Sequence, residues 1–132
     1  MPSSKRSKRI LVLDNSEEVL SRLETLLAGA GYETVSTWSG LEALRHLEAG
    51  PFDALLLEDY IADLHTGDFL RRVLQLANHP RVIVMRITPK PGNLRRYESL
   101  GVSAFVEKHR LEGIPRILAA CWTRQGFPES AE

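Results

Sequence analysis

Five short apolar runs, each followed by a stretch with helical spacing, constrain the fold of this chain more than any other feature of its sequence. A short, wholly apolar run is typical of a strand covered on both faces, and apolar residues three and four apart indicate a helix with one buried side. Strands and helices that alternate in this way form a parallel sheet with right-handed crossovers and helices on both faces. The expected strands are Ile10–Leu13, Thr34–Thr37, Ala54–Leu57, Val82–Met85 and Ala104–Val106.

The intervening segments carry the signals of helix ends. Ser16 and Ser39 are suited to cap the first two helices. Gly29 and Gly31 are suited to end the first helix, and the Gly50-Pro51 pair is suited to end the second. The later helices are expected from the apolar faces Phe69, Leu70, Val73, Leu74, Ala77 and Ile114, Ile117, Leu118, Cys121, Trp122, with a short helix over Asn93–Leu100 between them.

Length and composition favour a single domain without targeting segments. The 132 residues divide into a basic N-terminal tail (1–9), a domain (10–125) and a C-terminal tail (126–132). The 17 Lys and Arg balance the 17 Asp and Glu, which argues against direct nucleic-acid binding. A single cysteine, Cys121, excludes an intrachain disulfide, and no apolar run reaches bilayer length. We therefore expect a cytoplasmic domain without membrane contact.

Three polar residues follow three of the expected strands. Asp14, Asp59 and Lys108 each come just after an apolar run. The C-terminal ends of parallel strands line the crevice where ligands bind in open sheets of this kind. Two carboxylates and an ammonium that converge there could hold a divalent cation and a phosphoryl group.

With these residues in place, the chain resembles the receiver domain of bacterial two-component response regulators over nearly its whole length. The resemblance implies a flavodoxin-like, doubly wound (βα)5 fold with strand order 2-1-3-4-5. It also implies that Asp59 accepts a phosphoryl group from a histidine kinase or phosphotransfer protein. Such a domain is not an enzyme with a small-molecule substrate; it acts through contacts with a downstream protein or, as in many receivers, a homodimer.

Two neighbouring acids compete for the phosphoacceptor position. The family has a turn glycine eight residues after the acceptor, and Gly67 meets that spacing from Asp59. A count from Asp53, an acid often found before the third strand, selects Glu58 instead. Adjacent strand residues point to opposite faces, so only one of the two acids can face the site. The glycine spacing governs the loop beside the site, and it favours Asp59.

The resemblance also implies a Mg²⁺ site. Its ligands would be Asp14, Asn15, Asp59 and the backbone carbonyl of Ile61. The family has a second acid where Asn15 stands, so one negative charge is missing and we expect weak binding. Asn15 also suits a helix cap.

Lys108 matches the family lysine, whose ammonium would pair with Asp59 at rest and bind a phosphoryl oxygen after transfer. The family follows this lysine with a cis-proline, but this chain has His109. A cis peptide before a residue other than proline costs about 3 kcal/mol, so we expect a trans bond here.

The switch residues depart furthest from the family. Arg86 stands where the family has a Ser or Thr whose hydroxyl bonds the phosphoryl group, and Thr88 is a possible substitute. Phe105 is the aromatic that accompanies switching. Arg86 either points into solvent, or binds a phosphate, or reaches Asp59 and imitates the phosphorylated state.

Two rival interpretations remain. The first is a pseudo-receiver, which has the same fold but binds proteins without phosphorylation; Asn15, Arg86 and His109 favour it. The second is a flavodoxin-like enzyme domain that binds a small molecule or a nucleotide, which would need a phosphate-cradling loop that no βα segment supplies. By analogy, Phe105 and the Arg95–Tyr97 segment are candidates for a partner interface.

Overall fold

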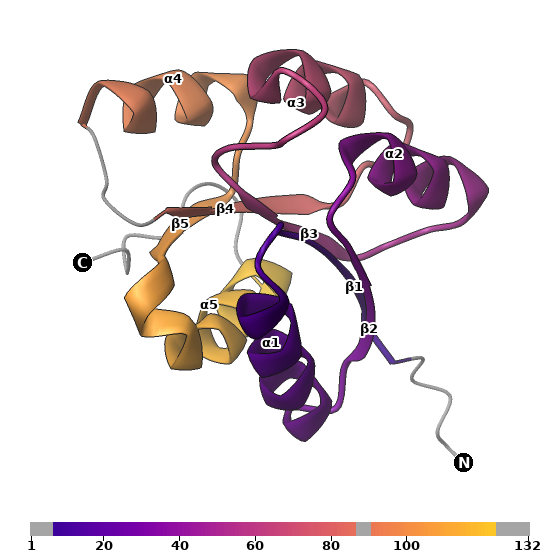
Figure 1. The fold of residues 1–132 in the computed structure, drawn as a ribbon, viewed down its shortest axis with the longest axis vertical. Helices are drawn as coiled ribbons and strands as arrows, with labels where there is room; N and C mark the ends of the chain where they lie inside the picture. The colour runs from indigo at the N-terminus through magenta and orange to yellow at the C-terminus, as the bar shows by residue number, and fades with distance from the viewer. Residues whose placement is uncertain (1–6, 87–90, 124–132) are drawn as a thin grey trace.

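Five parallel strands form one sheet, with the order β2-β1-β3-β4-β5. The computed structural model describes residues 7–86 and 91–123. Strands and helices alternate as expected (Figure 1): β1 Arg9–Leu13, α1 Glu17–Gly29, β2 Glu33–Thr37, α2 Gly40–Ala49, β3 Ala54–Glu58, α3 Thr66–Leu74, β4 Arg81–Arg86, α4 Pro91–Leu100, β5 Ala104–Glu107, η1 (a 3-10 helix) Lys108–Gly113 and α5 Ile114–Thr123. This is the flavodoxin-like topology, and the predicted strand order is confirmed.

The helices cover the two faces of the sheet unequally. In Figure 1, α1 and α5 lie on one side, and α2, α3 and α4 lie on the other. Side chains alternate along each strand, so Ile10, Val12 and Leu56 pack with the α1 and α5 residues, while Leu55 and Leu57 pack with those of α2 and α3. This alternation fixes the face on which each residue at a strand end emerges.

Capping side chains set where the helices begin. The Oγ atom of Ser16 accepts a hydrogen bond from the Val19 amide at the start of α1, and Ser39 accepts from Glu42 at the start of α2. Since Ser16 is the cap of α1, the cap role considered for Asn15 is wrong. At the start of α3 the cap is His65, whose ring nitrogen accepts from the Asp68 amide.

The beginning of α2 packs closely against the loop that follows β3. A Cβ atom on Gly40 would lie 2.9 Å from Leu64 Cδ1 and 3.1 Å from Ile61 Cγ2. Only glycine allows this approach without displacing the loop. The contact holds the β3–α3 loop, which borders the site, against α2.

The predicted boundaries need small corrections. β3, β4 and β5 each extend one residue beyond the apolar runs, so Glu58, Arg86 and Glu107 belong to strands. The peptide bond before His109 is trans, as predicted. Across residues 7–86 and 91–123, no helix is long and apolar enough to cross a membrane.

Candidate functional site

Two carboxylates and one ammonium meet at the C-terminal edge of the sheet, but one of the carboxylates is not the predicted one. Lys108 Nζ lies 2.9 Å from Asp14 Oδ2 and 3.4 Å from Glu58 Oε1. Asp14 is 1% exposed, and it lies just past β1. We call Asp14, Glu58 and Lys108 the acidic cluster.

The pleat of the strands explains why Glu58 takes this place. Leu13 pairs with Leu57 across β1 and β3, so Asp14 and Glu58 come next to each other at the strand ends. Both lie an even number of residues from side chains that pack with α1 and α5. Lys108, which directly follows β5, likewise lies an even number of residues from Ala104 and Val106 of that strand. The three side chains therefore emerge on the α1–α5 face.

Backbone amides and charges set the protonation of the acidic cluster. The Ser16 amide donates to Asp14 Oδ1 at 2.9 Å, and the Asn15 amide donates to Glu58 Oε1 at 3.4 Å. Burial raises the pKa of Glu58 above its ordinary value, and the nearby charge of Asp14 raises it further. The Lys108 ammonium and the Asn15 amide offset part of this rise.

Asp59, Arg86 and Tyr97 form a separate group on the other face of the sheet, which we call the Asp59 cluster. Asp59 Oδ2 lies 3.2 Å from Arg86 Nε, and Asp59 Oδ1 accepts a hydrogen bond from the Tyr97 hydroxyl. Every second side chain of β4 points to the same face of the sheet, so Arg86 points to the face of Val82 and Val84. These two residues pack on the side of α2, α3 and α4. The Tyr97 ring lies 5.5 Å from the Phe105 ring, centroid to centroid. Both oxygens of Asp59 are thus engaged.

The side chains of the Asp59 cluster are largely buried. The Arg86 side chain is only 7% exposed, and that of Asp59 is 25% exposed. Burial raises the pKa of Tyr97 to about 12, and the hydrogen bond and charge of Asp59 contribute to the rise. Tyr97 therefore stays a neutral hydrogen-bond donor throughout the physiological range. Among residues 7–86 and 91–123, the buried Arg86 Nη1 has no hydrogen-bond partner.

Several predictions about single residues can now be judged. The predicted pairing of Lys108 with Asp59 is wrong, because Lys108 contacts Asp14 and Glu58. The predicted reach of Arg86 to Asp59 is confirmed, and its solvent-facing alternative is wrong. Phe105 is buried against Tyr97. Thr88 lies outside the described residues.

Tyr97 is the site residue that the sequence did not reveal. It was a candidate for a partner interface, but it is 7% exposed and turned toward Asp59. Phe105, the other buried interface candidate, is 5% exposed. The available signal was the spacing of Tyr97 from Leu100 on an amphipathic helix, which favours an inward face without naming its target.

The predicted magnesium ligands Asp14 and Asp59 have different partners in this structure. Asp14 pairs with Lys108, whereas the two oxygens of Asp59 are bonded to Arg86 and Tyr97. In the part of the chain that the structure describes, no three His, Cys, Asp or Glu side chains are grouped to hold a metal. The side chain of Ile61 is buried, and the role of its carbonyl stays a prediction. Asp14 and Glu58 are the carboxylates that lie together.

Asp63 supports the loop beside the site. It stands where the receiver pattern usually has proline, and its carboxylate accepts hydrogen bonds from the Ser39 hydroxyl and from the Gly40 and Leu41 amides. Burial by itself would raise the pKa of Asp63, but these three hydrogen bonds outweigh it and lower the pKa below its ordinary value. The loop after β3 is thereby tied to the N-terminus of α2.

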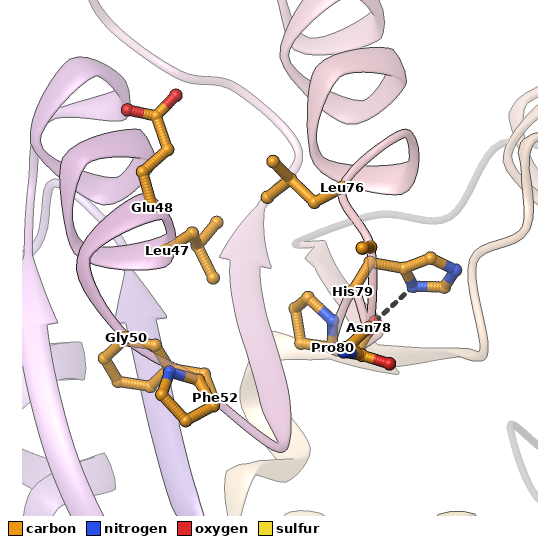
Figure 2. A pocket seen from close by; sticks show the side chains of 10 residues that line it. Leu47, Glu48, Gly50, Phe52, Leu76, Asn78, His79 and Pro80 are labelled. Carbon is orange, nitrogen blue, oxygen red and sulfur yellow. Dashed lines mark hydrogen bonds between the residues drawn. The ribbon is translucent and has the colours of Figure 1, made fainter.

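A different pocket, of about 330 Å³, lies at the opposite edge of the sheet. Figure 2 shows Leu47 of α2 and Leu76, just after α3, facing each other across it. His79 lies at its border and is hydrogen-bonded to the Pro80 carbonyl. None of the residues of the acidic cluster or of the Asp59 cluster lines it.

Comparison with known proteins connects this geometry to a family. Residues 10–118 match the model of the response regulator receiver domain. Over 94 residues, 71% of this chain, the sequence is 24% identical to the uncharacterized transcriptional regulatory protein YcbL of Bacillus subtilis, of which the match covers 40%. It is 33% identical over 58 residues to the CAI-1 autoinducer sensor kinase/phosphatase CqsS of Vibrio cholerae; that match covers 44% of this chain and 8% of CqsS. The chain thus spans less than half the length of either relative.

Solved structures share the fold at low sequence identity. The chemotaxis response regulator CheY4 of Vibrio cholerae has a TM-score of 0.77 at 18% identity, with 90% of this chain and 98% of that one covered. The signal receiver domain of an HD domain-containing protein from Pseudomonas fluorescens Pf-5 has a TM-score of 0.80 at 19% identity, covering 89% and 95%.

Proposed function

Because this chain belongs to the response regulator receiver family of two-component signalling, we propose that it is a pseudo-receiver, a protein-binding module that works without phosphorylation. The observation that carries the proposal is the state of Asp59. Arg86 and Tyr97 engage both of its carboxylate oxygens, and the family lysine, Lys108, lies with Asp14 and Glu58 instead.

Chemistry favours this interpretation over a phosphoacceptor at Asp59. In-line attack on a phosphoryl group needs a carboxylate oxygen with a free lone pair, and nearby cations that stabilise the transition state. Arg86 and the Tyr97 hydroxyl bind both oxygens of Asp59 before any phosphoryl group is present, which makes this carboxylate a weaker nucleophile. Receiver domains in general bind Mg²⁺ at their acidic pocket, and here Lys108 already neutralises part of the charge that would attract it.

The positions of Arg86 and Phe105 support a fixed state. A switch responds to a phosphoryl group only by the difference in its binding energy between two states. Here a guanidinium is already bonded to Asp59, and Phe105 is already buried against Tyr97. A phosphoryl group would therefore add little preference for one state. The domain would act through its surfaces, not through turnover of a small molecule.

Glu58 favours a second candidate, phosphorylation within the acidic cluster. It is the carboxylate next to Lys108 and Asp14, in the place expected of the acceptor. Burial is the main cause of its raised pKa, so at a given pH a smaller fraction of Glu58 is the carboxylate that could attack a phosphoryl group. We rank this candidate second for that reason.

Incubation with acetyl phosphate and Mg²⁺, followed by intact-mass measurement, tests the proposal. We expect no added phosphoryl group on the wild type. A gain that disappears in Asp59→Asn would restore the predicted phosphoacceptor, and a gain that disappears in Glu58→Gln would move it to the acidic cluster. Either result would contradict the pseudo-receiver. A receiver domain known to be phosphorylated, treated in parallel, verifies that the reagent is active.

A further inference from the structure

A pocket of about 290 Å³ opens beside Asp59, between the β3–α3 loop and α4. In Figure 1 this loop passes below α3, and α3 and α4 are neighbours on the same face of the sheet. The walls combine aromatic and aliphatic side chains with polar and charged ones. Its lining includes Asp59, Tyr60, Leu64, Gly67 and Arg96.

The charge of this pocket is positive. Asp59 on its wall is already neutralised by Arg86. Arg96 is exposed and, among residues 7–86 and 91–123, forms no ion pair. Its Nη2 would lie 3.5 Å from a Cβ atom placed on Gly67, so the guanidinium lies over the first turn of α3. Arg96 is thus the charge on the pocket wall that lacks a carboxylate partner in the described chain.

Large apolar side chains are exposed around the same edge. Tyr60, which lines the pocket, is 67% exposed. Trp38 and Leu41, at 65% and 49%, lie on the segment that Asp63 ties to the loop carrying Tyr60. Tyr, Trp and Arg are the residues that most often dominate the energy of protein interfaces. The combination indicates a protein-binding surface.

We propose that this pocket docks an acidic, apolar peptide segment of a partner protein. The inference rests on the proposed protein-binding function and specifies its partner. A bulky apolar side chain of the segment enters the pocket against Tyr60 and Leu64, and a neighbouring carboxylate pairs with Arg96. A volume near the lower end of ligand pockets suits one or two side chains and not a large cofactor.

Selection from a display library of random short peptides on the full chain tests this proposal. We expect the selected peptides to carry Asp or Glu next to a bulky apolar residue. A synthetic copy should lose about tenfold or more in affinity for Arg96→Glu, because the change replaces attraction with repulsion. Arg95→Glu makes the same charge change at the adjacent exposed position of α4, outside the pocket lining, and should lose less than about threefold.

The binding position separates this docking site from other surfaces. Amide NMR shifts on titration with the peptide should centre on Tyr60 and Gly67, and Tyr60→Ala should weaken binding while leaving circular dichroism unchanged. Peptides without acidic residues, equal losses in the two Arg variants, shifts centred elsewhere, or no selected peptide would each overturn the proposal. The acetyl phosphate experiment tests the pseudo-receiver itself, so a failure of either idea is recognisable separately.

Discussion

The acidic cluster and the Asp59 cluster differ in how their charges are balanced, although they are built from adjacent strand ends. In the acidic cluster, one ammonium faces two carboxylates. In the Asp59 cluster, one carboxylate is held by a guanidinium and a hydroxyl. In the first, burial and then the negative charge of Asp14 raise the pKa of Glu58, whereas in the second the charges of Asp59 and Arg86 balance each other. Glu58, the last residue of β3, and Asp59, which follows it, thus have separate environments because successive side chains at the end of the strand point to opposite faces.

The difference shows which carboxylates pair with the lysine that matches the family pattern. Lys108 pairs with Asp14 and Glu58. The carboxylate that the glycine spacing selects, Asp59, is joined instead to the fourth strand and α4 through Arg86 and Tyr97. If the clusters are independent, variants in one should leave the other unchanged.

The largest expected effect comes from removing the cation of the acidic cluster. Lys108→Met leaves the fully buried Asp14 and its neighbour Glu58 without a counter-charge, and should lower the free energy of unfolding by about 3 kcal/mol or more. Urea denaturation monitored by circular dichroism measures this. Arg22→Met is the matched control, because its pair with Glu112 is exposed on both sides and should cost less than about 0.5 kcal/mol. Equal losses would contradict the buried pairing.

Neutralising Asp59 should lower the free energy of unfolding by a smaller amount. Asp59→Asn leaves the Arg86 guanidinium buried without a counter-charge, and should destabilise the domain by about 2 kcal/mol. In an acidic pocket, the same neutralisation would relieve repulsion and stabilise the protein. Urea denaturation of both proteins distinguishes the two, with Glu98→Gln on the exposed side of α4 as the control. A stabilised Asp59→Asn variant would show that Asp59 lies among carboxylates.

The hydrogen bonds of Asp63 should contribute less to the stability of the domain. Asp63→Ala removes three hydrogen bonds from the start of α2 and should cost about 1 kcal/mol, while Asp63→Asn, which keeps an acceptor oxygen, should cost less. The pKa of this carboxyl is lower in the folded chain, so its contribution is present above the ordinary pKa and is lost as the pH falls through the lowered one. Denaturation at neutral and acid pH measures both effects. An equal loss at the two pH values would contradict the assignment.

The ionisation of Tyr97 gives an effect visible in a spectrum more than in stability. With a pKa of about 12, its hydroxyl should ionise later than an ordinary tyrosine, as read from phenolate absorbance against Tyr97→Phe. Because the folded pKa is raised, this contribution to stability is complete below the unfolded value near 10 and is lost as the pH rises toward 12. Asp59→Asn should lower the pKa, though not to its ordinary value, since burial is the larger cause. An unchanged pKa of Tyr97 in Asp59→Asn would show that the two side chains do not interact.

The fold was predictable because the relevant signals are local. Alternating apolar runs, serine caps and glycine stops define each strand and helix without knowledge of the others, and they yielded the parallel sheet. The strand order came from the family resemblance, and the structure has it. The predicted C-terminal ends of β3 and β4 were one residue too early, because the charged residues Glu58 and Arg86 resemble loop residues.

The site depended on relations that no single segment carries. The sequence shows that Glu58 and Asp59 face opposite ways, but the register Leu13 to Leu57 decides which of them meets Asp14. The glycine spacing from Asp59 indicated the wrong neighbour for Lys108, because it measures distance along a loop and not pairing across strands. Tyr97 was missed because its partner lies on another element, 38 residues away.

A double-mutant cycle between Lys108 and Asp59 tests the separation of the two clusters most directly. Unfolding free energies of the wild type, Lys108→Met, Asp59→Asn and the double variant give the coupling, with the cycle of Lys108→Met and Glu58→Gln measured beside it. We predict a coupling below about 0.5 kcal/mol for Lys108 with Asp59, and about 1 kcal/mol or more for Lys108 with Glu58. A strong coupling to Asp59 and none to Glu58 would contradict the account.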